Sequence, residues 1–449
     1  MRTTSRRTTE LGLIVLAAII TVGLYTLASL GRTASIPTDI VPFLVGVLGL
    51  MVVCHLAVRR FAPTADAVLL PIAGLLNGIG YVFIARLDES LAGLQMTWTF
   101  LAVAAFVATL VLLRRVRDLE RYRFTFMLAG VALLVLPLAP GIGQNINGSR
   151  IWVALGPLNF QPGEFAKLAL AIFFASYLVE KREVLGVAAR RIGPLALPEL
   201  RHFGPVLLAW GISLLVMLAE KDLGSSLLFF TLFIVVLWVA TDRASYLFIG
   251  GALFSAGAFV AWLIFAHVQQ RVDIWLDAFG KASGDGYQIV QATFALAWGG
   301  IAGTGLGLGN PTSIPAAKTD FIFAVIGEEL GLFGTVAVLA AFLLIVGVGL
   351  RIALRASSPF ETLLAVGLTT IIGFQAFIIM GGVTRLVPLT GITLPFVSYG
   401  GSSLISNYIL LALLLRISAG DLQPSHEPLP EGADDATTFG TLSPVEDAP

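Results

Sequence analysis

The segment from Lys318 to Gly331 reads KTDFIFAVIGEELG and opens a long apolar stretch of the chain. Asp320 stands at the beginning of this stretch, and Glu328 and Glu329 follow about two helical turns later. A charged side chain in the hydrocarbon core of a bilayer costs about 2.5–3.5 kcal/mol on insertion scales, so residues of this kind usually have a function. The three carboxylates are therefore the first candidates for a functional site.

The composition of the whole chain indicates a polytopic membrane protein. Hydrophobic residues make up 57% of the 449 residues and charged residues only 12%, and the mean hydropathy is +0.90. A soluble domain of this size would have too few charged residues to cover its surface. The net charge is zero, which gives no indication of a nucleic-acid partner. Cys54 is the only cysteine, which excludes an internal disulfide, and the four histidines have no metal-binding spacing.

The apolar stretches predict an all-α fold, a bundle of about 12 transmembrane helices, because each stretch can cross a hydrocarbon core of about 30 Å. The predicted spans cover residues 11–30, 40–58, 67–85, 95–113, 124–139, 164–179, 203–219, 222–241, 245–266, 320–350, 360–383 and 390–415. We interpret the first as a retained span, since it is too long for the apolar region of a signal peptide and lacks a clear cleavage site.

The basic residues predict the orientation. With a cytoplasmic N-terminus, most of the 28 Lys and Arg residues fall in cytoplasmic segments, and each of those segments has at least one. Both termini are then cytoplasmic. The resulting segments are 1–10, the cytoplasmic N-terminus; 11–139, five N-terminal spans; 140–163, an external loop; 164–266, four spans; 267–319, a large external loop; 320–416, three C-terminal spans; and 417–449, a disordered cytoplasmic tail.

The large external loop combines aromatic residues with a glycine-rich run. Residues 287–298 are amphipathic and predict a helix at the membrane interface. The run 299–309 contains a G-x-G-x-G pattern, but no strand precedes it and no Lys-Ser/Thr pair follows it. The pattern therefore favours a flexible or tightly packed loop over a phosphate-binding loop.

Other charged residues have structural interpretations that compete with functional ones. Glu164 and Lys167 are three residues apart, so on a helix they share a face and can form an ion pair, which can close the helix start, contribute to a cavity, or do both. Asp222 begins an apolar span, where its carboxylate is expected to cap the helix. For Glu328 and Glu329, hydrogen bonding between spans is favoured over catalysis.

Asp320 differs from these residues because it lies where the large external loop meets the membrane. A general base needs access to water and substrate, and a partly apolar site would raise its pKa towards a useful value. From the residues alone, three other carboxylates in the loop are competing candidates for the general base, namely Asp273, Asp277 and Asp285.

Five groups of residues together resemble the SEDS family of RodA and FtsW proteins. In chain order they are 160–164 (FQPGE), 221–224 (KDLG), 286–288 (GYQ), 319–331 (TDFIFAVIGEELG) and 393–403 (TLPFVSYGGSS). The family core has ten spans, and this chain adds two at its N-terminus. Three further groups resemble the twelve-span RodA-type branch of actinobacteria, at 59–63, 75–78 and 381–386.

The resemblance implies a peptidoglycan glycosyltransferase that polymerises lipid II at the outer face of the plasma (inner) membrane, for cell elongation and shape. It also implies membrane lipid around the protein and a class B penicillin-binding protein, a transpeptidase, as its partner. The essential aspartate of the family matches Asp320, and the glutamate of its Gln-Pro-x-Glu motif matches Glu164. Two positions depart from the family: Lys318, where His is common, and Asn159, where an Arg is common that could contact pyrophosphate.

The resemblance leads to a mechanistic hypothesis. Asp320 removes the proton from the GlcNAc 4-hydroxyl of an acceptor, whose oxygen attacks C1 of the donor MurNAc and displaces undecaprenyl pyrophosphate with inversion. This leaving group is strongly negative, so cations must stabilise it. The candidate substrate-binding residues are Glu164, Lys167, Arg271, Lys318, Arg385, Ser398 and Ser402, with Asp222, Glu328 and Glu329 in supporting roles. No cofactor is certain, and a divalent cation such as Mg²⁺ or Mn²⁺ is an open alternative to protein cations.

Two other functions stay open at this stage. A lipid II flippase would need polar residues that continue to the cytoplasmic side, whereas the identifiable intramembrane charges lie in the outer half. A non-catalytic scaffold for the transpeptidase would leave the buried acids unexplained.

Overall fold

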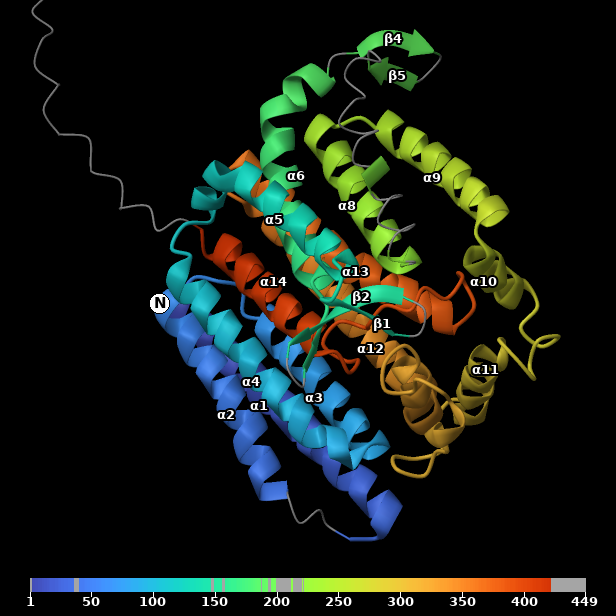
Figure 1. Ribbon diagram of the computed structural model, residues 1–449. Coiled ribbons are helices and arrows are strands. Elements are labelled where there is room, and N and C mark those ends of the chain that lie inside the picture. The colour runs from blue at the N-terminus through green and yellow to red at the C-terminus, as the bar shows by residue number, and fades with distance from the viewer. Residues whose placement is uncertain are drawn as a thin grey trace, which may run out of the picture.

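The structure, a computed structural model, is a bundle of long helices with two small antiparallel sheets (Figure 1). It describes residues 2–35, 40–146, 149–155, 158–186, 188–192, 195–198, 211–212, 220 and 222–420. The α-helices are α1 (Arg2–Thr33), α2 (Ile40–Phe61), α3 (Leu69–Leu87), α4 (Glu89–Leu112), α5 (Arg123–Val135), α6 (Gly163–Gly186), α8 (Leu223–Thr241), α9 (Ser245–Ile264), α10 (Ala266–Leu276), α11 (Tyr287–Gly299), α12 (Ile322–Arg355), α13 (Pro359–Val383) and α14 (Gly401–Ala419). Short 3-10 helices are η1 (Val116–Tyr122), η2 (Leu136–Leu138) and η4 (Pro311–Ser313).

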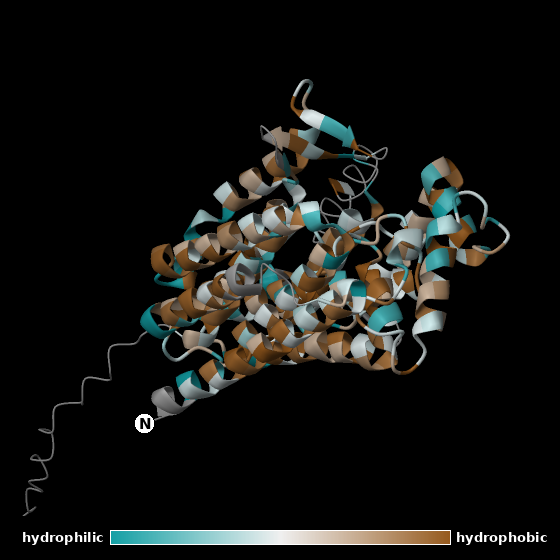
Figure 2. Ribbon diagram, turned by 90° about the horizontal axis from the view of Figure 1, so that it is seen from below, coloured by the Kyte–Doolittle hydropathy of each residue, from teal (hydrophilic) through white to brown (hydrophobic). Residues whose placement is uncertain are grey.

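The all-α membrane architecture predicted from composition is confirmed. In the described part of the chain, nine helices are long and apolar enough to cross a membrane. Helices cover every predicted span except 203–219, almost all of which lies outside the described residues. Figure 2 shows hydrophobic residues along most of the helices and hydrophilic residues mainly at helix ends and in connecting segments. Side chains such as Phe248 and Phe259 on α9 are exposed on the outside of the bundle, where lipid would cover them.

Helices α13 and α14 lie at the centre of the bundle, between α1 to α4 on one side and α9 to α11 on the other (Figure 1). α14 packs against α4 and α6, and α13 packs against α6, α8 and α12. Tyr408 of α14 is fully buried, with its ring edge-on to Phe106 and Phe396. Its hydroxyl accepts a hydrogen bond of 3.2 Å from Asn77 Nδ2, which pairs two polar side chains inside an apolar core.

One predicted span boundary is wrong, and another predicted span contains a break. The sequence predicts a span over 390–415, but α14 begins only at Gly401, and residues 384–400 form an irregular connection after α13. Positive φ angles at Gly391 (78°) and Phe396 (65°) interrupt helical geometry there. The other stretch, predicted over 320–350, corresponds to α12, in which Gly331 has a φ of 64° and divides the helix in two.

The apolar pattern also gave no indication of the two sheets. β1 (Gly143–Ile146), β2 (Ser149–Leu155) and β3 (Leu158–Phe160) form an antiparallel sheet within the loop predicted at 140–163, with β2 in the middle. β4 (Ala188–Ile192) pairs with β5 (Leu195–Pro198). Only two residues separate the end of β3 from the start of α6, so the first sheet fixes where that helix enters the bundle.

We predict that Gly331→Ala lowers the thermal stability of the protein, whereas Gly347→Ala does not. An alanine at 331 would be held at positive φ, and its Cβ would overlap the Gly303 nitrogen and the Ile301 carbonyl oxygen, at a cost of at least about 1–3 kcal/mol. A Cβ at Gly347, in the same helix, meets open space and improves helix propensity. Thermal unfolding of both variants in detergent checks this, and equal unfolding midpoints would contradict it.

Candidate active site around Asp320

Asp320 borders a cavity of about 580 Å³ formed by α10, the start of α11 and two irregular segments. The lining residues are Gln270, Arg271, Ile274 and Trp275 of α10, Gly284, Asp285, Tyr287, Gln288 and Ile289 around the start of α11, Pro315, Ala316 and Asp320 before α12, and Leu389 and Gly391. Of these residues, Arg271 alone is cationic. A cavity of this size that combines two carboxylates, Asp285 and Asp320, with one guanidinium is a suitable site for a polar ligand.

The backbone around Asp320 is held by the irregular connection between α13 and α14, residues 384–400, which we call the 384–400 segment. Ser398 Oγ donates a hydrogen bond of 2.7 Å to the Thr319 carbonyl oxygen, and the Tyr399 N–H donates one of 2.9 Å to the Lys318 carbonyl oxygen. Ser398 Oγ also accepts from the Leu394 N–H at 2.9 Å. Ser398 thus positions the backbone beside Asp320, and a direct substrate contact by this residue stays a prediction.

Asp320 has the electrostatic properties of a general base. It lies two residues before α12, lines the cavity and is otherwise surrounded by protein. Desolvation by this surrounding protein raises the pKa of Asp320 to about 6, and the negative charge of Asp222 adds to the rise. The Arg271 guanidinium and the Thr319 hydroxyl act in the opposite direction. A carboxylate with a pKa of about 6 is ionised at neutral pH and is still basic enough to take up a proton.

Arg271 connects Asp320 with Asp222. A Cβ built on Gly391 would lie 3.6 Å from Asp320 Oδ2 and 3.8 Å from Arg271 Nη2, so both side chains flank the same point of the backbone. Arg271 Nη1 donates to the Leu389 carbonyl oxygen at 2.8 Å, which fixes the guanidinium. Burial lowers the pKa of Arg271, and the carboxylates of Asp222 and Asp320 oppose this change.

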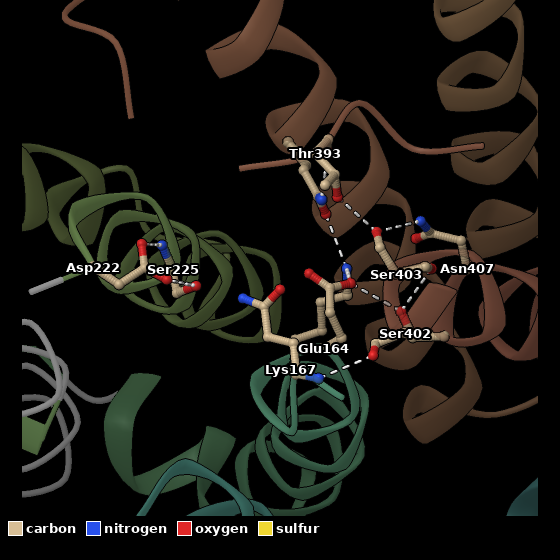
Figure 3. Close-up of polar contacts among 11 residues, drawn as sticks. Glu164, Lys167, Asp222, Ser225, Thr393, Ser402, Ser403 and Asn407 are labelled. Atoms are coloured by element: carbon tan, nitrogen blue, oxygen red, sulfur yellow. Dashed lines mark hydrogen bonds and ion pairs between the residues drawn. The ribbon is translucent and has the colours of Figure 1, made fainter. Parts of the chain in front are cut away.

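Asp222 caps α8, as the sequence predicts. Its Oδ1 accepts from the Ser225 N–H at 3.1 Å and its Oδ2 from the Ser225 hydroxyl at 2.6 Å (Figure 3). Burial raises the pKa of Asp222, and the hydrogen bonds from Ser225 lower it. The Asp222 carboxylate therefore has two roles: it caps the start of α8, and its negative charge acts on Arg271.

Glu164 and Lys167 form a second buried cluster at the start of α6 (Figure 3). Lys167 Nζ donates to Glu164 Oε2 at 2.6 Å and to Gln375 Oε1 at 2.9 Å, and Ser406 Oγ donates to Glu164 Oε2 at 3.0 Å. The predicted ion pair is confirmed. Neither residue lines the cavity at Asp320, so a role in substrate binding stays a prediction for both.

The 384–400 segment and the start of α14 connect the two clusters. Gln375, which binds Lys167, donates through Nε2 to the Thr393 carbonyl oxygen at 2.9 Å. Ser402 Oγ accepts from the Gln161 N–H at 2.9 Å and so fixes the entry to α6, while its predicted contact with substrate is untested. Figure 3 shows these groups from α6 and α14 pointing towards one another.

Two of the predicted phosphate-binding cations do not line the cavity and are held by other protein groups. Lys318 Nζ forms an ion pair of 3.0 Å with Asp88 Oδ2, at the corner between α3 and α4. Arg385 donates through Nη2 to the Trp275 carbonyl oxygen at 3.2 Å and lies over the ring of Phe279. Among the proposed cations, Arg271 is thus the one that the structure places next to Asp320.

The two buried glutamates hold the loop of residues 300–310, which we call the glycine loop. Glu329 Oε2 accepts from the Gly307 N–H at 2.9 Å, and Glu328 Oε1 accepts from the Asn310 N–H at 2.8 Å. Glu329 also forms an ion pair of 3.1 Å with Arg86 at the end of α3. The predicted structural role of both glutamates and the interpretation of the glycine run as a tightly packed loop agree with these contacts.

Sequence reasoning missed several residues that organise the site. Arg86 and Asp88 at the end of α3 hold the glycine loop and Lys318, and Gln375 joins the two clusters. Charged residues at a predicted span end were a usable signal for the first two. Gln375 lies inside an otherwise apolar span, where an uncharged polar residue indicates a buried hydrogen-bonding partner.

The described residues contain no group of three His, Cys, Asp or Glu side chains that could hold a metal ion. A divalent cation held in part by substrate phosphate, as the sequence analysis allows, stays an untested alternative.

The fold and the site define a polytopic helical membrane protein with an acid–base site beside a cavity. The family model for FtsW, RodA and SpoVE, described as cell cycle protein, matches residues 67–422. The peptidoglycan glycosyltransferase RodA of Mycobacterium tuberculosis is 46% identical over 94% of this chain and 92% of its own length, and that of Mycobacterium leprae is 45% identical over the same shares. This chain thus belongs to the FtsW/RodA/SpoVE family.

Solved structures show the same relationship. A chain from a peptidoglycan synthase complex, described as coordinating polymerization and crosslinking, has a TM-score of 0.65 and 28% identity, covering 79% of this chain and 97% of that chain. The rod shape determining protein RodA of Thermus thermophilus has a TM-score of 0.56 and 26% identity, covering 79% of this chain and 96% of that chain.

We predict that Lys167→Met destabilises the protein by about 3–5 kcal/mol, because it leaves the Glu164 carboxylate buried without its cation. The double variant Lys167→Met/Glu164→Gln should recover part of this loss, since an amide needs no countercharge. The measurement is thermal unfolding in detergent of the single variant, the double variant and the unmodified protein. A double variant no more stable than the single one would show that the unpaired charge is not the cause.

Proposed function

We propose that this protein is a peptidoglycan glycosyltransferase that polymerises lipid II, with Asp320 as its general base. The observation that carries the proposal is the Asp320 carboxylate, with its raised pKa, beside Arg271 in a cavity large enough for sugar. Membership of a family whose mycobacterial relatives are named peptidoglycan glycosyltransferase RodA supports the same activity.

In the proposed reaction, Asp320 takes the proton from the 4-hydroxyl of the acceptor GlcNAc. The oxygen attacks C1 of the donor MurNAc from the face opposite the diphosphate, and a β-1,4 bond forms as the bond between C1 and the diphosphate oxygen breaks. The undecaprenyl diphosphate leaves with the bonding electron pair, so its negative charge grows in the transition state. Arg271 is the cation of the cavity and is therefore assigned to stabilise this charge.

A second, apolar cavity supports a lipid-linked substrate. It has a volume of about 410 Å³ and lies between α8, α9, α10 and α13, with lining residues that include Phe230, Phe254 and Phe377. Arg271 and Leu389 line both cavities, so the apolar one meets the polar one at the guanidinium. A polyprenyl chain in the apolar cavity, a diphosphate at Arg271 and a sugar beside Asp320 would match this order of apolar, cationic and acidic surfaces.

We infer that the Asp320 cavity faces the outer side of the plasma membrane and that both termini are cytoplasmic. The excess of basic residues in the segments on the opposite side supports this orientation. We also propose a class B penicillin-binding protein as partner, because a similar solved structure comes from a complex described as coordinating polymerization and crosslinking.

The alternative of a lipid II flippase needs a polar path from one membrane face to the other. The structure does contain buried charges at the opposite end of the bundle, where Glu10 binds Arg7 and, at 2.6 Å, His55, which corrects the expectation that such charges lie only in the outer half. This cluster lies between α1 and α2. None of its residues lines the polar or the apolar cavity, so it gives no support to a transport path.

Asp320→Asn should reduce lipid II polymerisation at least about 100-fold, because the amide keeps the shape of the side chain and cannot accept the proton. Asp273→Asn is the matched control, since Asp273 is exposed and paired with Lys281 at 3.0 Å. Both variants and the unmodified protein are incubated with purified lipid II in detergent or liposomes, with and without the candidate transpeptidase, and the glycan polymer is resolved on a gel. Equal polymer from Asp320→Asn and the control would refute the assignment of the base.

The pH dependence of kcat/KM for polymerisation should report the pKa of Asp320 in the free protein. The base must be deprotonated, so kcat/KM rises with pH and reaches half its maximum at about pH 6. Because the positive charge of Arg271 lowers this pKa, Arg271→Gln should move the midpoint to higher pH, whereas Arg271→Lys keeps the charge and should move it less. Profiles of kcat/KM between about pH 5 and about pH 8 test this, and a midpoint unchanged by Arg271→Gln would contradict the electrostatic coupling.

A further inference from the structure

The C-terminal end of α1 lies in direct backbone contact with the glycine loop that leads to Asp320. A Cβ on Gly31 would overlap the carbonyl oxygen of Leu306. In the reverse direction, a Cβ on Gly307 would overlap the Ala28 carbonyl oxygen and lie 3.1 Å from the Arg32 nitrogen. Glycine is therefore required on both sides of this contact, and Gly307 in addition has a φ of 78°.

The side chain of Leu306 strengthens the same contact. It packs into a small apolar cluster formed by Ala28 of α1 with Tyr81, Val82 and Ala85 of α3. The neighbouring Leu308, on the same loop, is 64% exposed and takes no part in this cluster. One residue of the loop is thus inserted between α1 and α3.

The contact is connected to the catalytic carboxylate through a short length of chain. The Gly307 and Asn310 N–H groups bind the carboxylates of Glu329 and Glu328, which fixes the loop against the first part of α12. Only a few residues later, Pro315 and Ala316 line the cavity, and Asp320 follows. A displacement of Leu306 and Gly307 would therefore be transmitted to the wall of the cavity.

Most of the apolar part of α1 is exposed on the outside of the bundle. It packs mainly against α3 and α2, and only 22% of its most apolar window is buried. Residues 1–66, which include α1 and α2, lie outside the region matched by the family model. The contact with the glycine loop is therefore an interaction that this region adds to a family core.

We propose that α1 is a positioning element of the active site: Gly31 and Ala28 hold Leu306 and Gly307 where the following segment places Asp320 against the cavity. This inference rests on the proposed glycosyltransferase activity, which supplies the assay.

The first test compares Gly31→Ala with Gly23→Ala, since Gly23 lies on the same helix and a Cβ there meets open space. Gly31→Ala should lower kcat for lipid II polymerisation about tenfold or more, because small displacements of catalytic groups are costly, while KM changes by less than about twofold. The acid limb of the pH profile should move to lower pH, because a displaced loop admits water to Asp320 and reduces its desolvation. Gly23→Ala should match the unmodified protein in all three quantities.

A second pair of variants covers the case in which Gly31→Ala does not fold. Leu306→Ala removes only a half-buried loop side chain, and Leu308→Ala removes an exposed one from the same loop. We expect Leu306→Ala to lower kcat at least about threefold and to shift the acid limb in the same direction, with Leu308→Ala unaffected. A purely structural role of α1 would change the unfolding midpoint and leave the pH profile in place.

The outcomes separate this inference from the proposed function. Absence of polymer from the unmodified protein, with and without the transpeptidase, would refute the glycosyltransferase itself. If the unmodified protein makes polymer, and Leu306→Ala equals Leu308→Ala in kcat and in pH profile, the positioning role of α1 is refuted while the glycosyltransferase stands.

Discussion

Backbone polar groups at the edge of the hydrocarbon region must be satisfied by the protein itself, because lipid offers them no hydrogen bonds. Two irregular segments meet around Asp320: the segment that contains the glycine loop, and the 384–400 segment. Side chains of the protein supply the missing hydrogen-bond partners. Glu328 and Glu329 accept from backbone N–H groups of the glycine loop. Ser398 donates to the Thr319 carbonyl oxygen, and Gln375 donates to the Thr393 carbonyl oxygen in the 384–400 segment. These polar groups inside the apolar helices allow a rigid, non-helical site to exist at this depth.

The same constraint explains how the charges are distributed. A buried charge is tolerated when it is paired, and Glu329 with Arg86 and Glu164 with Lys167 are each placed opposite a partner. At the Asp320 cavity one cation instead faces two carboxylates, Asp222 and Asp320. That incomplete compensation leaves the carboxylate at the cavity with a raised pKa, and it distinguishes a reactive site from the structural ion pairs around it.

The sequence predicted the helical membrane fold, the cap at Asp222 and the pair of Glu164 with Lys167, because each depends on local spacing and on the cost of burying charge. It did not predict where α14 begins. An apolar composition over 390–415 is equally compatible with a helix and with an irregular segment whose polar groups are satisfied by distant residues such as Gln375. The sequence also could not separate Arg271 from Lys318 and Arg385 as the cation at the cavity. That choice depends on partners such as Asp88 and Trp275, which are distant in sequence.

The electrostatics of the cavity suit a reaction that both begins and ends with a proton transfer. In the proposed reaction, a diphosphate bound at Arg271 would compensate the guanidinium and weaken its stabilisation of the ionised Asp320, so the carboxylate would become more basic when the donor is in place. Departure of the diphosphate would return Arg271 to the two carboxylates, lower the pKa of Asp320 again and favour release of the proton to water. A single arginine between donor and base would thus couple basicity to occupancy, which a base with its own fixed partner, such as Glu164, could not do.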